Sequence, residues 1–199
     1  MPSILFHEYV GDKIAKLNKK YDTNNFYLGL MVPDSVNAYG FASKDNRWRT
    51  HLRDENLDKW QENIIDFYNR NIESYEETYL AGYVIHVLTD IFCDKIYQSE
   101  IYPKLLNEGF DYHLAYAHYE NAIEKFENSN INKEWWKQAK EKFKNADVFP
   151  ICGMEKKMIL DEVEYTLNKY SSRVYEKCGF IDDWFVEKVL EKLREISYV

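Results

Sequence analysis

The sequence predicts an all-α protein in which residues 1–199 form a single multi-helix bundle of six to seven helices. Only 7 glycines and 4 prolines occur among the 199 residues, too few for the many tight turns of an all-β sandwich. Hydrophobic residues make up 45% of the chain, which is enough for a substantial core. Apolar residues recur every three or four positions in most segments, the periodicity of helices that bury one face.

The first helix is expected over residues 4–20, where His7 shares a stripe with apolar side chains. An apolar run, Phe26–Val32, follows a polar break, and Pro33 should push the residue before it away from helical geometry. Residues 35–46 are expected to form a loop.

Further helices follow from the same periodicity. The segment 75–97 is apolar nearly all round in its middle, which is typical of a helix enclosed by others. The remaining helices are expected at residues 56–71, 112–127, 133–144, 155–170 and 182–197.

The charge balance argues against some partners. Asp and Glu number 34 against 26 Lys and Arg, a net charge of −8, so neither a nucleic-acid partner nor stable membrane association is expected. No apolar stretch reaches the roughly 18 residues of a membrane helix, and no signal peptide is recognisable. The 3 cysteines fit no disulfide framework. A cytoplasmic location is expected.

The enclosed helix carries a pair that suggests metal binding. His86 and Asp90 are four residues apart and project from one helix face. Burying an imidazole and a carboxylate is costly unless both have partners. A divalent cation such as zinc would satisfy both groups, and so would a hydrogen bond between them.

Other candidates are ambiguous one by one. His7 could be a core residue or a ligand, and Asp34 could cap a helix or begin a turn. His51, just ahead of the helix at 56–71, could lie on the surface. The acidic residues Asp161, Glu162 and Glu164 are expected to be surface charges, although one of them could face a metal cluster.

The order of these residues resembles the zinc-dependent phospholipase C family, which is all-α and shares its fold with zinc-dependent single-strand nucleases. The resemblance covers about half the chain, roughly residues 3–97. It is carried by the stretches Ser3–His7, Tyr27–Asp34, Arg49–His51 and Ala81–Asp90.

The resemblance implies that Asp34, His51, His86 and Asp90 hold one metal ion. Asp90 would bridge to a second ion that His7 also holds. In the family, the ions activate a water molecule and hold the phosphate of a phosphoester, the logic of two-metal hydrolysis. Asp34 would act as a ligand or as the catalytic general base.

The chain also departs from the family. It begins with Met1-Pro2, where secreted members have an N-terminal tryptophan that binds metal, and it lacks the later His-x-x-x-Glu of the third metal. His113 and His118 are five residues apart, a poor helical alignment, and Asp94 could be a substitute ligand or a solvated helix end. One or two divalent ions are therefore expected; zinc is the first choice, and iron or manganese would also fit.

We therefore expect a metal-dependent phosphoric ester hydrolase acting on a small phosphoester. One alternative is a degenerate, non-catalytic family member with a structural metal site or a binding role. Another is a helical nucleotide phosphohydrolase, but the adjacent His-Asp pair of that superfamily is absent from the sequence.

Overall fold

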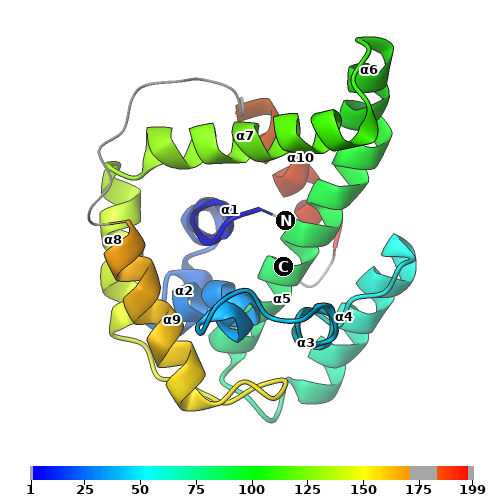
Figure 1. Cartoon of the computed structure of the whole chain (residues 1–199). Helices are drawn as coiled ribbons and strands as arrows, with labels where there is room; N and C mark the ends of the chain where they lie inside the picture. The colour runs from blue at the N-terminus through cyan, green and yellow to red at the C-terminus, as the bar shows by residue number, and fades with distance from the viewer. Residues whose placement is uncertain (1, 171–182, 197–199) are drawn as a thin grey trace.

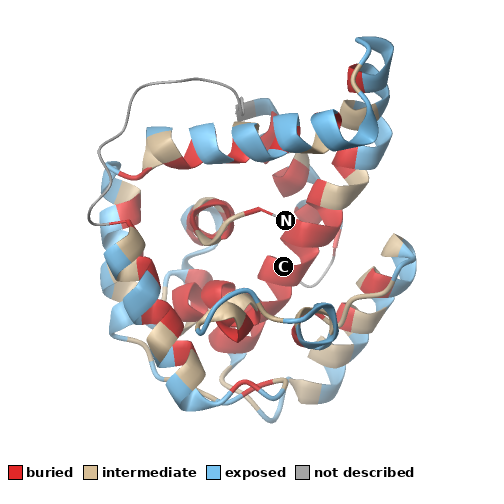
Figure 2. Cartoon of the chain, in the orientation of Figure 1, coloured by how far each residue is buried: buried red, intermediate tan, exposed pale blue. Residues whose placement is uncertain are grey.

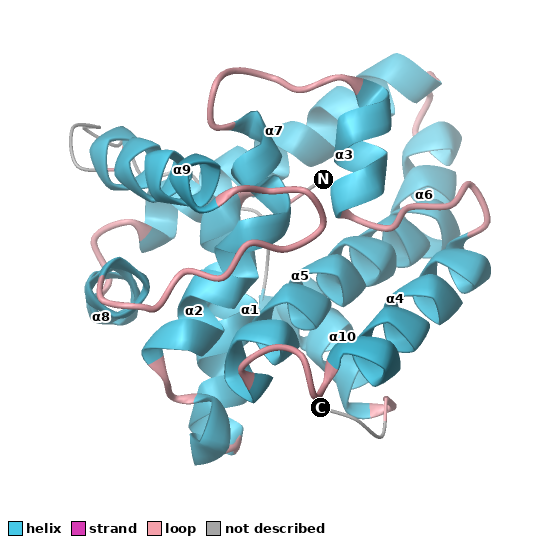
Figure 3. Ribbon diagram, turned by 90° about the horizontal axis from the view of Figure 1, so that it is seen from below, coloured by secondary structure: helices cyan, strands magenta, loops and turns pink. Residues whose placement is uncertain are grey.

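A computed structural model describes residues 2–170 and 183–196 and confirms the all-α class. No strand occurs among these residues; the nearest feature is an isolated bridge between Ile151 and Met154 (Figure 3). The helices are α1 (Ile4–Leu17), α2 (Asn24–Met31), α3 (Lys44–Thr50), α4 (Leu57–Asn71), α5 (Glu77–Ile96), α6 (Tyr102–Asn107), α7 (Tyr112–Asn130), α8 (Glu134–Lys144), α9 (Lys156–Lys169) and α10 (Asp183–Arg194).

The bundle is built around α1 and α5. Figure 1 shows α1 end-on, with α7, α5, α2 and α8 arranged around it. Ser3 caps α1 by accepting a hydrogen bond from the Phe6 amide, an interaction that commonly begins a helix. The faces that α1, α2 and α5 turn toward one another are buried (Figure 2), so residues on these helices meet away from water.

The helix α5 is buried nearly all round, as its sequence predicts. It packs along α2 on one side and α4 on another, and Figure 3 shows α4 and α5 side by side. A Cβ atom on Gly82 of α5 would lie 2.2 Å from the Phe26 carbonyl oxygen. A Cβ atom on Gly29 of α2 would lie 2.2 Å from the Tyr79 carbonyl oxygen. The two backbones therefore touch at glycines, where any side chain would separate them.

Three short helices were not predicted. These are α2, α3 and α6, and they raise the helix number above the expected six to seven. The expectation of a loop over residues 35–46 was wrong at both ends, since a 3-10 helix runs over Val32–Asn37 and α3 begins at Lys44. The helix expected at 182–197 is α10, and both of those end residues lie outside the described residues.

The expectation for the residue before Pro33 was also wrong. Val32 is helical, with φ −57° and ψ −44°, because its amide continues α2 by bonding to carbonyls of that helix. Pro33 begins the next helical turn, where its missing N–H costs nothing. The continuous path from α2 brings Asp34 back toward the buried centre. Among the described residues, no helix has the length and apolar character needed to cross a membrane.

Candidate metal centre

Five side chains from four separate elements meet inside the bundle. His7 comes from α1, Asp34 from the 3-10 helix, and His51 from the residue that ends α3, while His86 and Asp90 come from α5. All are buried except Asp34, whose side chain is 13% exposed. These are the five residues that the resemblance implies as ligands. His51 is buried, so the expectation that it could lie on the surface is wrong, whereas the burial of His7 agrees with a core residue and with a ligand alike.

The two carboxylates lie among the three imidazoles. Asp90 Oδ1 is 3.4 Å from His7 Nε2, and Asp90 Oδ2 is 3.5 Å from His51 Nε2 and 3.8 Å from His86 Nε2. Asp34 Oδ1 is 3.4 Å from His51 Nε2, and Asp34 Oδ2 is 4.0 Å from His86 Nε2. The two oxygens of Asp90 thus face different histidines, the arrangement of a carboxylate able to bridge two ions.

These separations are long for hydrogen bonds and suit ligands of a common ion. Hydrogen bonds from nitrogen to oxygen measure about 2.7–3.2 Å. Two ligands that are each about 2.1 Å from one tetrahedral ion lie about 3.4 Å apart. Two sets of three, His7 with Asp34 and His86, and His51 with His86 and Asp90, offer one ligand atom per residue within 4.8 Å of one another.

The buried polar atoms of the cluster need a partner. The Nε2 atoms of His7, His51 and His86 and both carboxylate oxygens of Asp90 have no hydrogen-bond partner among the described residues. A buried polar atom without a partner costs about 1–3 kcal/mol. A divalent cation accepts nitrogen and oxygen ligands together, so the donor set fits such an ion.

Two of the imidazoles are oriented through their other ring nitrogen. The Nδ1 of His86 is 2.5 Å from the Leu30 carbonyl oxygen, and the Nδ1 of His51 is 2.9 Å from that of Arg47. A carbonyl only accepts, so Nδ1 carries a proton in both rings and Nε2 of each ring points into the cluster. This is the usual orientation of metal-binding histidines.

The electrostatic environment favours a neutral His86 and ionised Asp34 and Asp90, the forms that bind a cation. Burial, and then the neighbouring His7, lower the pKa of His86 to about 3, so its ring is neutral. Burial would raise the pKa of Asp90, but contacts with His7, His86 and His51 outweigh it and hold this pKa well below the usual value. Asp34 follows the same pattern, with its contact to His51 as the largest lowering influence.

A narrow pocket leads from the surface to Asp34. Its volume is about 140 Å³, and Asn37, Glu162, Thr166 and Lys169 are among the residues that line it. Burial, followed by the charge of Asp34, raises the pKa of Glu162 to about 7. Glu162 Oε2 has no hydrogen-bond partner among the described residues, so the general expectation of a surface charge is wrong for this residue.

The other candidates lie elsewhere. His113 and His118 are exposed on α7, and Asp94 forms an ion pair with Arg53 at 2.8 Å. Asp161 pairs with Lys157 and accepts a hydrogen bond from Tyr39, and Glu164 is exposed. None of these five acidic or imidazole groups belongs to either set of prospective ligands.

Comparison of the chain with protein-family models, with curated proteins and with solved structures gave no match.

Proposed function

We propose that this protein is a metal-dependent phosphoesterase that binds one or two divalent ions, with zinc as the first choice, through His7, Asp34, His51, His86 and Asp90. The observation that carries the proposal is the convergence of these side chains, whose facing nitrogen and oxygen atoms lie 3.4–4.0 Å apart. Those of the three histidines and of Asp90 have no hydrogen-bond partner among the described residues. The mixture of nitrogen and oxygen ligands suits zinc and also admits iron or manganese. The resemblance to the zinc-dependent phospholipase C family supports the phosphoester chemistry.

The two aspartates of the cluster would have different roles. A bound divalent ion supplies hydroxide at neutral pH and stabilises charge on phosphoryl oxygens. Asp34 lines the pocket and is the partly exposed carboxylate of the cluster, so it can accept a proton from an attacking water. Asp90 is fully enclosed among the histidines and serves to hold the ligand set together.

The pocket favours a small substrate. Its volume of about 140 Å³ is below the roughly 300–1,000 Å³ of pockets that enclose a drug-sized ligand. A phosphate group could enter and reach Asp34 while the rest of the ester stayed outside. Among the described residues that line this pocket, Lys169 is the one cation, and it would attract the phosphate.

The test combines a substrate panel with ligand variants. The purified protein is assayed on phosphocholine esters, nucleotides, single-stranded nucleic acid and bis-p-nitrophenyl phosphate. We expect turnover of at least one ester, and we expect His86→Ala and Asp90→Ala to abolish both metal retention and turnover. Each variant should lose metal affinity and activity by more than the about 10–100-fold seen when only a residue that hydrogen-bonds to a ligand is removed.

His118→Ala is the matched control, because His118 is an exposed histidine outside the cluster. It should retain metal and activity. Unchanged metal content in His86→Ala or Asp90→Ala would refute the assigned site. Full metal content with no turnover of any ester would instead favour a structural metal site in a non-catalytic protein.

A further inference from the structure

A second, separate groove lies on the surface between α3 and α4. Its volume is about 760 Å³, within the range of pockets that bind small molecules. Arg49, Arg53 and Arg70 line it, and its described lining contains no Asp or Glu. Three guanidinium groups in one groove are notable in a chain with a net charge of −8. The groove shares no residue with the prospective metal ligands.

Two of the three guanidinium groups have no anionic partner among the described residues. Arg53 pairs with Asp94, whereas Arg49 donates to the Cys152 carbonyl at 2.7 Å and to the Asn46 side-chain oxygen at 3.5 Å. Arg70 donates through Nε to the Asp66 main-chain carbonyl at 3.1 Å. Neutral acceptors leave the positive charges of Arg49 and Arg70 uncompensated, so the groove favours an anion.

The position of Arg49 is fixed by the chain around it. Its guanidinium lies against Gly153, where a Cβ atom would come within 1.8 Å of Nη1. Cys152 and Gly153 both have positive φ, which forms the tight turn that offers the Cys152 carbonyl to Arg49. A guanidinium held in place loses less freedom on binding, and its planar fork matches the oxygens of a phosphate.

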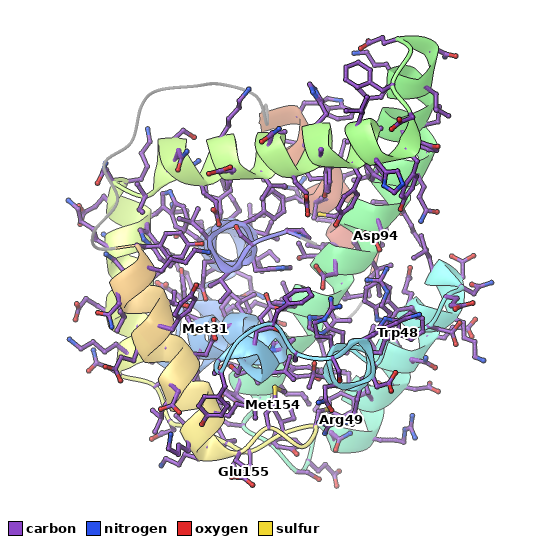
Figure 4. All side chains as sticks on the ribbon, in the orientation of Figure 1. Met31, Trp48, Arg49, Asp94, Met154 and Glu155 are labelled. Carbon is purple, nitrogen blue, oxygen red and sulfur yellow. The ribbon has the colours of Figure 1, made fainter. Side chains whose placement is uncertain are left out.

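Flat apolar side chains share the groove with the cations. Trp48 and Phe67 line it and are each partly buried, and Figure 4 shows Trp48 and Arg49 together on α3 beside α4. Large aromatic side chains in a pocket provide surfaces against which a planar ring can stack. We propose that this groove binds a nucleoside phosphate, with the phosphate on Arg49 and Arg70 and the base against Trp48 and Phe67.

The proposal is tested by calorimetric titration of the protein as purified. Three probes are compared. Adenosine diphosphate carries both the base and the phosphates, methylenediphosphonate represents the anionic part alone and cannot be cleaved by a phosphoesterase, and adenosine represents the nucleoside alone. We expect adenosine diphosphate to bind most tightly. Arg70→Gln and Arg49→Gln should each lower the affinity for adenosine diphosphate and for methylenediphosphonate by about tenfold. Arg194→Gln, an exposed arginine on α10, is the matched control and should bind like the unchanged protein.

Several results would overturn the proposal. One is the absence of saturable binding of adenosine diphosphate. Another is equal affinity for it in the unchanged protein and in Arg70→Gln, which removes an exposed side chain and leaves the turn at Cys152 intact. Equal affinities for methylenediphosphonate and adenosine diphosphate would contradict the assignment of the base to the aromatic wall. The proposal does not rest on the metal site, since binding here is judged by the arginine variants.

Discussion

The imidazole rings of His7 and His86 lie stacked, with their centroids 3.6 Å apart and their planes 11° from parallel. They bring the first helix and the enclosed helix α5 into direct contact at the centre of the bundle. Two positively charged rings would repel each other at this distance, and the depressed pKa of His86 means that at least one ring is neutral. The neutral form is the one that binds a metal ion.

Metal binding should release a proton from His51. Burial opposes protonation of His51, but its contact with Asp34 and the charges of Asp90 and Asp34 outweigh burial and raise its pKa above 6.5. Below that raised pKa the metal-free protein carries a proton that the ion must displace. We therefore expect affinity to increase with pH through this range, and calorimetry in buffers of different ionisation enthalpy measures the released protons. An affinity that stays constant between about pH 6 and 8 would contradict this reading of His51.

Tyr83→Phe should weaken metal binding, although Tyr83 is not one of the prospective metal ligands. The Tyr83 hydroxyl donates to the carbonyl of Thr50, the residue before His51. Its loss frees the end of α3, so we expect metal affinity to fall by about 10–100-fold and stability by about 1–3 kcal/mol. Metal titration and denaturant unfolding measure the two effects.

Tyr79→Phe is the matched control for that variant. Tyr79 is also buried on α5, and its hydroxyl donates to the Phe149 carbonyl at 2.7 Å. It should show a similar loss of stability and an unchanged metal affinity. If both variants bind metal equally well, Tyr83 does not position His51.

Glu162 should make the metal-free protein less stable as pH rises from about 4.5 to 7. Its pKa is about 7 in the fold and 4.5 is its ordinary value, so between these values the folded state holds a proton that the unfolded state has released. The favourable contribution is complete below pH 4.5 and is lost by about pH 7. Glu162→Gln should reduce the loss of stability between about pH 5 and pH 8, as measured by unfolding at these two pH values.

The exposed residue Glu164, on the same helix, provides the control for that measurement. Glu164→Gln should leave the pH dependence of stability as it is in the unchanged protein. A slope in Glu162→Gln equal to that of the unchanged protein would show that Glu162 does not hold its proton in the fold.

Gly82→Ala should destabilise the fold strongly. The new Cβ would meet the Phe26 carbonyl oxygen at 2.2 Å and the Leu30 amide at 2.9 Å, both parts of a helix backbone that cannot move alone. We expect a loss of at least about 2 kcal/mol, and weaker metal binding because the Leu30 carbonyl orients His86. Gly11→Ala should cost less, since its Cβ meets the end of the Leu30 side chain. Equal losses in both variants, measured by denaturant unfolding, would contradict the close contact of α2 and α5.

The sequence predicted the parts of the fold that depend on helical periodicity. The nearly continuous apolar character of α5 indicated an enclosed helix, and the four-residue spacing of His86 and Asp90 placed both on one face. The burial of His51 could not be predicted, because α3 is short and polar and its position depends on contacts with residues outside this helix. Trp60 is one such contact, since its indole donates to the His51 carbonyl at 2.7 Å.

The burial of Glu162 is indicated by the sequence pattern around it. On α9 it shares a stripe at helical spacing with Ile159, Val163 and Thr166, all of them buried. A carboxylate within such a stripe indicates burial. The stripe does not show that Glu162 lies near Asp34. Asp34 belongs to a 3-10 helix, and Pro33 in that helix led us to expect a break in helical structure there.

The metal content of the protein, purified without chelators and measured by elemental analysis, tests the central claim most directly. We predict at least about one equivalent of a divalent transition metal, zinc first, and a lower thermal stability after the metal is removed. Less than about half an equivalent of any such metal, with no change in stability when zinc, iron or manganese is added, would contradict a metal site built from these three histidines and two aspartates.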